Sequence, residues 1–116
     1  MKRLIALSTV VSSLSFTAAV FADTGSSCHF HGSKPAAEAT VAQCASQRRD
    51  ALIKTGKLES SWQPIKQDKV EAVDGKKGKE WKITFRNPGA TDKSKATLYL
   101  FFTLPGNFIA ANFTGQ

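Results

Sequence analysis

The most apolar stretch outside the N-terminal region runs from Ala96 to Phe113. Two hydrophobic runs, ATLYLFFTL and FIAANF, flank the sequence Pro105-Gly106-Asn107. Proline presets the backbone at the second position of a turn, and glycine accepts the positive φ that a type II turn requires next. The pattern therefore predicts two adjacent antiparallel strands joined by a type II turn.

A second hairpin is predicted upstream, with strands at Lys69–Val73 and Lys79–Asn87 around the turn residues 74–78. In its second strand, apolar and polar side chains alternate as expected for a strand with one buried and one wet face. The apolar positions are Trp81, Ile83 and Phe85, and the polar positions are Lys82, Thr84 and Arg86.

One helix is predicted from Pro35 to Thr55. Proline suits the first helical turn, Ser33 is placed to cap it, and Gly56 is the expected stop. At a period of 3.6 residues one face collects mostly small apolar side chains: Ala37, Val41, Cys44, Ala45, Leu52 and Thr55. Arg48 falls inside this stripe, where it can snorkel at the sheet edge, pair with an acid or hold an anion.

These elements predict an α+β fold, in which one long N-terminal helix packs on a four-stranded antiparallel meander sheet. Alternate residues of the strand at 96–104 would face the helix, and Trp62 would cover the helix–sheet junction. Tyr99 and Phe101 would then lie on the opposite face. Two neighbouring aromatics there indicate a homodimer surface, a groove for a protein partner, or sheet curvature that hides them.

The first 22 residues resemble a cleavable export signal rather than part of the fold. Lys2 and Arg3 precede an apolar run, and Val20-Phe21-Ala22 puts small residues at the −3 and −1 positions of a signal peptidase site. We therefore expect cleavage after Ala22, a periplasmic location and no later transmembrane span. Cleavage lowers the formal net charge from +7 to +5. In this compartment the basic charge does not indicate nucleic acid, and interleaved acids favour an ordinary solvated surface.

Residues 23–34 form a predicted flexible Cys/His arm, followed by a single domain over 35–116. Cys28, His29 and His31 bring one cysteine and both histidines of the chain together. Thiolate and imidazole are ligands for copper and zinc, and a loop lets several donors reach one ion. We therefore predict that the arm captures Cu or Zn in an open coordination sphere, because a closed structural site needs a fourth ligand.

The alternative for Cys28 is a disulfide with Cys44, the only other cysteine. Cys44 lies about 14 Å along the helix from Pro35, and the chain from Cys28 to Lys34 reaches up to about 20 Å. A bond closing a loop of this size would contribute about 3 kcal/mol. It would remove Cys28 as a ligand and leave the two histidines as a weaker pair. Local order in the arm is expected only with such a bond or a bound ion.

The sequence holds no recognisable catalytic motif for a nucleophile, a metalloprotease or a phosphate-binding loop. A Cys/His pair at Cys28 would lie on an arm with nothing to orient it. We therefore expect a non-enzymatic protein.

The order of elements resembles a small uncharacterised family of exported bacterial proteins. The shared features are an export signal, a His-bearing start, a helix ending in Thr55-Gly56-Lys57-Leu58, then Trp62, a hairpin and a closing segment like NFIAANFTG, here Asn107–Gly115. This resemblance covers nearly the whole mature chain. It implies a binding or accessory role, with a metal ion as one candidate ligand, and supplies no catalytic residue.

The helix followed by antiparallel strands, with the turn Leu104-Pro105-Gly106-Asn107, is also similar in architecture to PepSY domains. Those are small exported modules proposed to inhibit or regulate peptidases. The resemblance implies an alternative function, in which the sheet docks a peptidase or another envelope partner through Tyr99 and Phe101.

Overall fold

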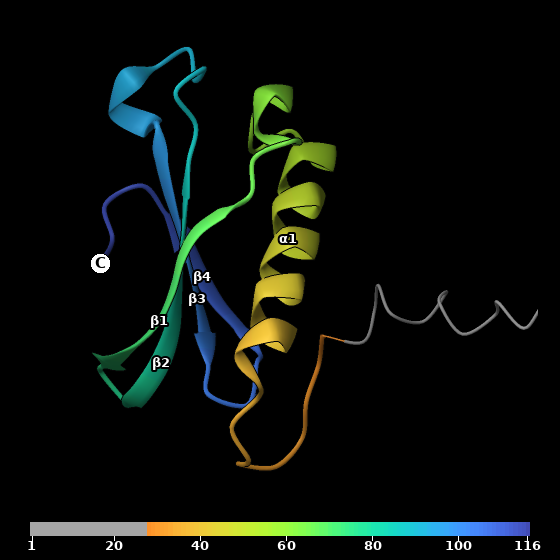
Figure 1. The fold of residues 1–116 in the computed structure, drawn as a ribbon, viewed down its shortest axis with the longest axis vertical. Helices are drawn as coiled ribbons and strands as arrows, with labels where there is room; N and C mark the ends of the chain where they lie inside the picture. Colours follow the sequence, from red (N-terminus) through yellow and green to blue (C-terminus); the bar gives the residue numbers. More distant parts are fainter. Residues whose placement is uncertain (1–27) are drawn as a thin grey trace, which may run out of the picture.

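One helix packs against one face of a four-stranded antiparallel sheet (Figure 1). The computed structural model describes residues 28–116, so the predicted signal peptide and the first five arm residues lie outside the described part. The elements are α1 (Glu38–Lys54), the short 3₁₀ helix η2 (Ser60–Trp62), β1 (Gln67–Gly75), β2 (Gly78–Arg86), η3 (Lys93–Lys95), β3 (Thr97–Thr103) and β4 (Phe108–Asn112). The predicted α+β class is confirmed.

The sheet is a meander with strand order β1-β2-β3-β4, and each strand pairs antiparallel with the next. The register sets Ile83 opposite Leu100 and Phe85 opposite Leu98, so the apolar alternation of both strands points to one face. A bulge in β4 leaves Ile109 without a Cα partner in β3. The two hairpins predicted from the apolar runs are both present.

The core lies between α1 and this face of the sheet. Its largest fully buried side chains are those of Trp62, Phe85, Phe102, Ile83, Leu98, Leu100 and Val41. The helix contributes Val41, Cys44 and Ala45, which are small, so the bulk comes from the strands and from Trp62. Trp62 is buried over the helix–sheet junction, as predicted.

Side-chain hydrogen bonds join α1 to β1 at the beginning of the sheet. Gln67 Nε2 donates to the Ala42 carbonyl (2.6 Å) and to Ser46 Oγ (2.7 Å). The buried Arg49 donates to the Ile65 carbonyl, two residues before β1 begins. These bonds fix where the first strand starts relative to the helix.

Helix α1 begins at Glu38, three residues later than predicted, and Ser33 does not cap it. Ala37 occupies the cap position in an extended conformation without a side-chain cap hydrogen bond. Just before it, the Ala36 N–H donates to the Leu104 carbonyl (2.8 Å). This tie to the far hairpin holds residues 36 and 37 extended and delays the helix.

The C-terminal end of α1 is the predicted one. Gly56 has φ +80°, a left-handed conformation that glycine adopts without strain. Its N–H donates to the Ile53 carbonyl (3.0 Å) and the Lys57 N–H to the Leu52 carbonyl (2.8 Å). This pair of bonds is a Schellman motif, which satisfies the last carbonyls of the helix.

The turn between β3 and β4 differs from the predicted type II turn by one residue. The Gly106 N–H donates to the Thr103 carbonyl (2.8 Å), so proline occupies the third turn position rather than the second. Gly106 still has the positive φ predicted for it, +112°, as in three-residue hairpin loops. The Leu104 carbonyl, which a type II turn would have used, accepts from Ala36 N–H and from Trp81 Nε1–H (3.0 Å). We call residues 104–107 the closing turn.

Tyr99 and Phe101 lie on the face of the sheet opposite α1, as predicted, but they do not form an exposed aromatic pair. Phe101, flanked across the strands by Lys82 and Ala110, is only 8% exposed. The Lys82 ammonium lies 4.9 Å from the Tyr99 ring centre, and Gly115 packs against the same ring. The C-terminal residues therefore fold over this face, where Figure 1 shows the chain end.

Within residues 28–116, no helix combines the length and the apolar character needed to cross a membrane.

Candidate functional site

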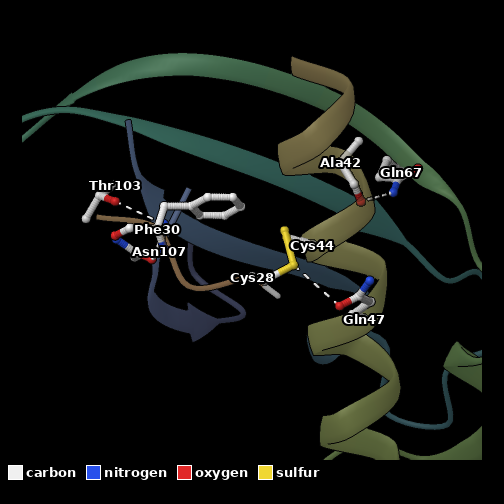
Figure 2. The surroundings of a disulfide bond; sticks show 8 residues. All are labelled: Cys28, Phe30, Ala42, Cys44, Gln47, Gln67, Thr103 and Asn107. Atoms are coloured by element: carbon white, nitrogen blue, oxygen red, sulfur yellow. Dashed lines mark hydrogen bonds between the residues drawn. A yellow bond between two sulfur atoms is a disulfide. The ribbon is translucent and has the colours of Figure 1, made fainter. Parts of the chain in front are cut away.

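The N-terminal end of the described chain is tied covalently to the helix. Cys28 and Cys44 form a disulfide with their Cα atoms 5.7 Å apart (Figure 2). Cys44 is buried on α1 at 3% exposure, whereas Cys28 is half-buried. Gln47 Oε1 lies 3.4 Å from Cys28 Sγ, and because a disulfide sulfur carries no proton this is a packing contact rather than a hydrogen bond. Of the two roles predicted for Cys28, the structure has the disulfide, so Cys28 is not available as a thiolate ligand.

A second attachment lies two residues further on, at Phe30. The Asn107 side chain pairs with both backbone groups of Phe30: its Oδ1 accepts from the Phe30 N–H (2.6 Å), and its Nδ2 donates to the Phe30 carbonyl (2.9 Å). Figure 2 shows this pairing at the closing turn. The Asn107 amide thus makes the pair of backbone hydrogen bonds that a neighbouring strand would make to Phe30. These bonds hold the arm against the β3–β4 hairpin.

The Phe30 ring also packs on Gly106. A Cβ atom at Gly106 would lie 2.8 Å from the ring carbon Cε2, so only glycine permits this approach. Phe30 packs against the hydrophobic core as well. We call residues Cys28–His31 the anchored segment. Local order in the arm was expected with either a disulfide or a bound ion, and the disulfide is present. The Phe30 contacts add a second attachment.

Both histidines project from the anchored segment and are exposed. Their ring centres are 4.9 Å apart and the planes are nearly perpendicular, at 89°. Imidazole nitrogens are suitable ligands for Cu and Zn, and rings this close can turn their nitrogens to one ion. Among residues 28–116, no three His, Cys, Asp or Glu side chains are placed together to hold a metal ion. The arrangement therefore offers two nitrogen donors and leaves the other coordination positions open.

A pocket of about 270 Å³ borders the disulfide, lined by Cys28, Cys44, Gln47, Arg48, Ala51, Phe102 and Phe108. The Arg48 guanidinium lies 4.1 Å from the centre of the Phe108 ring, a stacked cation–π contact. Phe108 belongs to the edge strand β4, so the Arg48 side chain lies at the sheet edge. This is the snorkelling alternative predicted for Arg48. Both half-cystines line this pocket.

A larger groove, of about 880 Å³, lies on the sheet face opposite the helix. Phe101, Ile109 and Pro105 give it an apolar lining. Four lysines and two acids surround them: Lys76, Lys77, Lys79 and Lys82 with Asp74 and Glu80. Ile109, at the bulge of β4, is 44% exposed and is the only large hydrophobic residue so exposed within 28–116.

Two shifted carboxyl groups lie away from both histidines, in the loops around η2 and η3. Hydrogen bonds from the Ser61 hydroxyl and from Thr91 hold the pKa of Glu59 below its ordinary value. The hydroxyl and the N–H of Ser94 do the same for the pKa of Asp92. The bond from Thr91 to Glu59 joins the two loops, whereas the Ser61 and Ser94 bonds are local to one loop each, and all of them indicate a structural role.

The sequence profile of a family of unknown function, DUF6488, matches residues 1–116. The chain belongs to this family. Membership agrees with the predicted uncharacterised family and assigns no activity to any residue. No curated protein and no solved structure matches the chain. The similarity to PepSY domains stays a prediction.

Two residues that organise the structure, Asn107 and Arg49, are not among the candidates predicted from the sequence. The sequence predicts only a turn at Asn107, because its partner Phe30 is 77 residues away in the chain. The helical period puts Arg48 on the apolar stripe, but the buried arginine is its neighbour Arg49. The hydrophobic period alone does not distinguish adjacent arginines at the margin of a helical face. A signal for Asn107 was its position directly after Pro105-Gly106, where an Asn side chain can reach backbone groups.

Proposed function

We propose that this family member is an exported, non-enzymatic accessory protein that captures copper or zinc through His29 and His31. The observation that carries the proposal is the closeness of two exposed imidazoles on a segment attached at two points. A donor pair on a free arm loses conformational entropy when it binds an ion. Attachment at Cys28 and Phe30 reduces that cost before the ion arrives.

Copper is the ion we expect to bind more tightly. The affinity of a nitrogen site for divalent metals rises to Cu²⁺ and falls again at Zn²⁺. Two imidazoles with open positions suit reversible capture and transfer, since a partner protein can add its own ligands to the same ion. The proposed compartment is the periplasm, where a disulfide such as Cys28–Cys44 persists.

Isothermal titration of the oxidised protein, lacking residues 1–22, tests the proposal with Cu²⁺ and with Zn²⁺. We expect one ion per chain, and a loss of binding in the His29→Ala/His31→Ala variant. Ser33→Ala/Lys34→Ala is the matched control, because it changes two exposed residues of the same arm and keeps both imidazoles. Equal affinity in the wild type and the histidine variant, or no binding in either, would refute the proposal.

The groove on the outer sheet face favours a second candidate function. Its apolar lining at Phe101 and Ile109, with four lysines against two acids around it, is complementary to an extended acidic segment of an envelope protein. Such a segment can pair with the edge strand β4, as in β-strand addition. This is the docking function predicted from the PepSY resemblance, with the groove lined by Phe101 and Ile109 in place of an exposed Tyr99 and Phe101 pair.

The second candidate is tested with a fluorescent octapeptide of alternating Glu and Leu. We expect binding that weakens with salt and is lost in Ile109→Glu, which puts a negative charge at the groove. Glu38→Gln, an exposed change on α1, is the control and should bind normally. Binding that is unaltered in Ile109→Glu would exclude the groove. A concentration-dependent dimer that Ile109→Glu abolishes would instead assign this face to a second copy of the chain.

A further inference from the structure

We infer that reduction of the Cys28–Cys44 disulfide creates a three-donor site for Cu(I), formed by Cys28, His29 and His31. This inference rests on the proposed function of the histidine pair and extends it to a second oxidation state of the protein. The three ligands are available together only in the reduced protein, and the ion that they prefer is the soft monovalent Cu(I).

The positions of the donors carry the argument. Three metal-ligating side chains lie within four residues, and in the oxidised structure the disulfide occupies one of them. The imidazoles of the other two already lie close together, with ring centres 4.9 Å apart. Breaking the disulfide therefore frees a sulfur donor one residue before His29, the first of the two nitrogen donors.

The second attachment makes this a defined change rather than the release of a disordered tail. Phe30 is held by Asn107 through two hydrogen bonds and by packing on Gly106. None of these contacts involves a cysteine. Reduction removes one tie and leaves the other, so His29 stays between a freed Cys28 and a fixed Phe30.

The disulfide is accessible to a reductant. It borders the pocket of about 270 Å³, and Cys28 is the more exposed of the two cysteines. A thiolate of a dithiol attacks Cys28 Sγ and forms a mixed disulfide, while Cys44 leaves as a thiolate and takes up a proton. The second thiol of the reductant then releases Cys28 and closes the reductant's own disulfide. Two electrons and two protons pass to the protein.

Ligand softness decides which ion gains most. Thiolate donors select Cu(I), whereas a site of two imidazoles holds Cu(II) and Zn without this preference. Loss of an outer-shell partner lowers metal affinity by about 10–100-fold, so an added thiolate ligand should raise Cu(I) affinity by at least about 100-fold. Because linkage is reciprocal, saturating Cu(I) should favour the reduced protein by the same factor, which raises the disulfide potential by about 60 mV.

Two single-cysteine variants provide a matched test. Both lack the disulfide: Cys44→Ser keeps the thiol beside the histidines, and Cys28→Ser keeps the thiol on the helix. Their Cu(I) affinities are measured without oxygen by competition with bicinchoninate, alongside the oxidised and the reduced wild type. Circular dichroism of all four proteins reports folding, and any destabilisation caused by loss of the disulfide is common to both variants.

We expect reduced wild type and Cys44→Ser to bind Cu(I) at least about 100-fold more tightly than oxidised wild type. Cys28→Ser should match the oxidised protein, and adding His29→Ala/His31→Ala to Cys44→Ser should remove the gain. Equal Cu(I) affinity in the two single-cysteine variants, or in oxidised and reduced wild type, would overturn the inference. Failure of the histidine pair itself is a separate result, seen in the Cu²⁺ titration of the oxidised protein.

Discussion

Asn107 acts at the scale of a single residue, since its one amide joins the first described residues to the last hairpin. Both of its hydrogen bonds to Phe30 are lost in Asn107→Ala. At about 1 kcal/mol for each bond, we expect the free energy of unfolding to fall by about 2 kcal/mol. Urea unfolding measures the loss, and faster hydrogen exchange at the Phe30 amide locates it.

Asn112 supplies the control for this prediction. Its Oδ1 accepts from the N–H groups of Thr114 and Gly115, so its bonds are local to the chain end. The Thr114 bonds are exposed to solvent, so water can replace them, and Asn112→Ala should cost only about 0.5 kcal/mol. If the two variants lost equal stability, Asn107 would have no special role in holding the arm.

Two separate features of the structure require glycine at position 106. Its φ of +112° strains other residues, and a Cβ would approach the Phe30 ring. We expect Gly106→Ala to lower the free energy of unfolding by about 1–3 kcal/mol for the backbone alone. Phe30→Leu should relieve only the steric part, so a double-mutant cycle should give a coupling of at least about 0.5 kcal/mol. Additive effects would mean that the ring does not constrain Gly106.

At the scale of elements, adjacent arginines on α1 make different connections. Arg49 is 8% exposed and donates to the carbonyl of Ile65 ahead of β1, whereas Arg48 stacks on Phe108 beside the pocket. Loss of a charged hydrogen bond costs about 1.5–3 kcal/mol, so Arg49→Met should be destabilising by about 2 kcal/mol. Arg48→Met should cost about 0.5–1 kcal/mol. Urea unfolding measures the stability lost in each variant. A larger loss in Arg48→Met than in Arg49→Met would contradict these roles.

The loops around η2 and η3 give stability a dependence on pH. The pKa of Glu59 is lowered in the folded protein, chiefly by the Ser61 hydroxyl. A carboxyl whose folded pKa is lowered contributes stability above its unfolded pKa, and that contribution is lost as the pH falls through the folded pKa. Melting temperatures measured from neutral to acidic pH should therefore decline below the ordinary range of glutamate, and the decline should be smaller in Glu59→Gln. An identical decline in both proteins would remove Glu59 as a cause.

Some helices, strands and turns could be predicted from the sequence, and others could not. The apolar alternation predicted the sheet and its buried face, and Gly56 predicted the end of α1, because both signals lie within a few residues. The start of α1 and the position of the closing turn were misplaced. Both depend on the Leu104 carbonyl, which accepts from Ala36 and Trp81, and bonds between segments far apart in the chain leave no local pattern. For the same reason the candidate site was recognised by its residue types, while its attachment through Asn107 was not.

At the scale of the whole molecule, the disulfide joins the core at Cys44, but most of the core is built without it. The core between α1 and the sheet is built mainly from Trp62 and the strands, and the disulfide closes only the segment between residues 28 and 44. Closing a loop of this length contributes about 3 kcal/mol. Domains are typically stable by about 5–15 kcal/mol, so the reduced protein should remain folded with a lower midpoint.

This expectation connects stability to the Cu(I) inference, because a reduced protein that unfolded would not present Cys28 beside two positioned histidines. Urea unfolding with and without a reductant should give one cooperative transition in each case, about 3 kcal/mol apart. In the absence of reductant, Cys28→Ser/Cys44→Ser should match the reduced wild type, which separates loss of the bond from the effect of the reductant. Adding Asn107→Ala to that double variant should release the second tie and increase hydrogen exchange from His29 to His31, while Trp62 stays buried. Loss of the whole core in the double cysteine variant would show instead that the fold depends on the disulfide, and would confine metal capture to the oxidised protein.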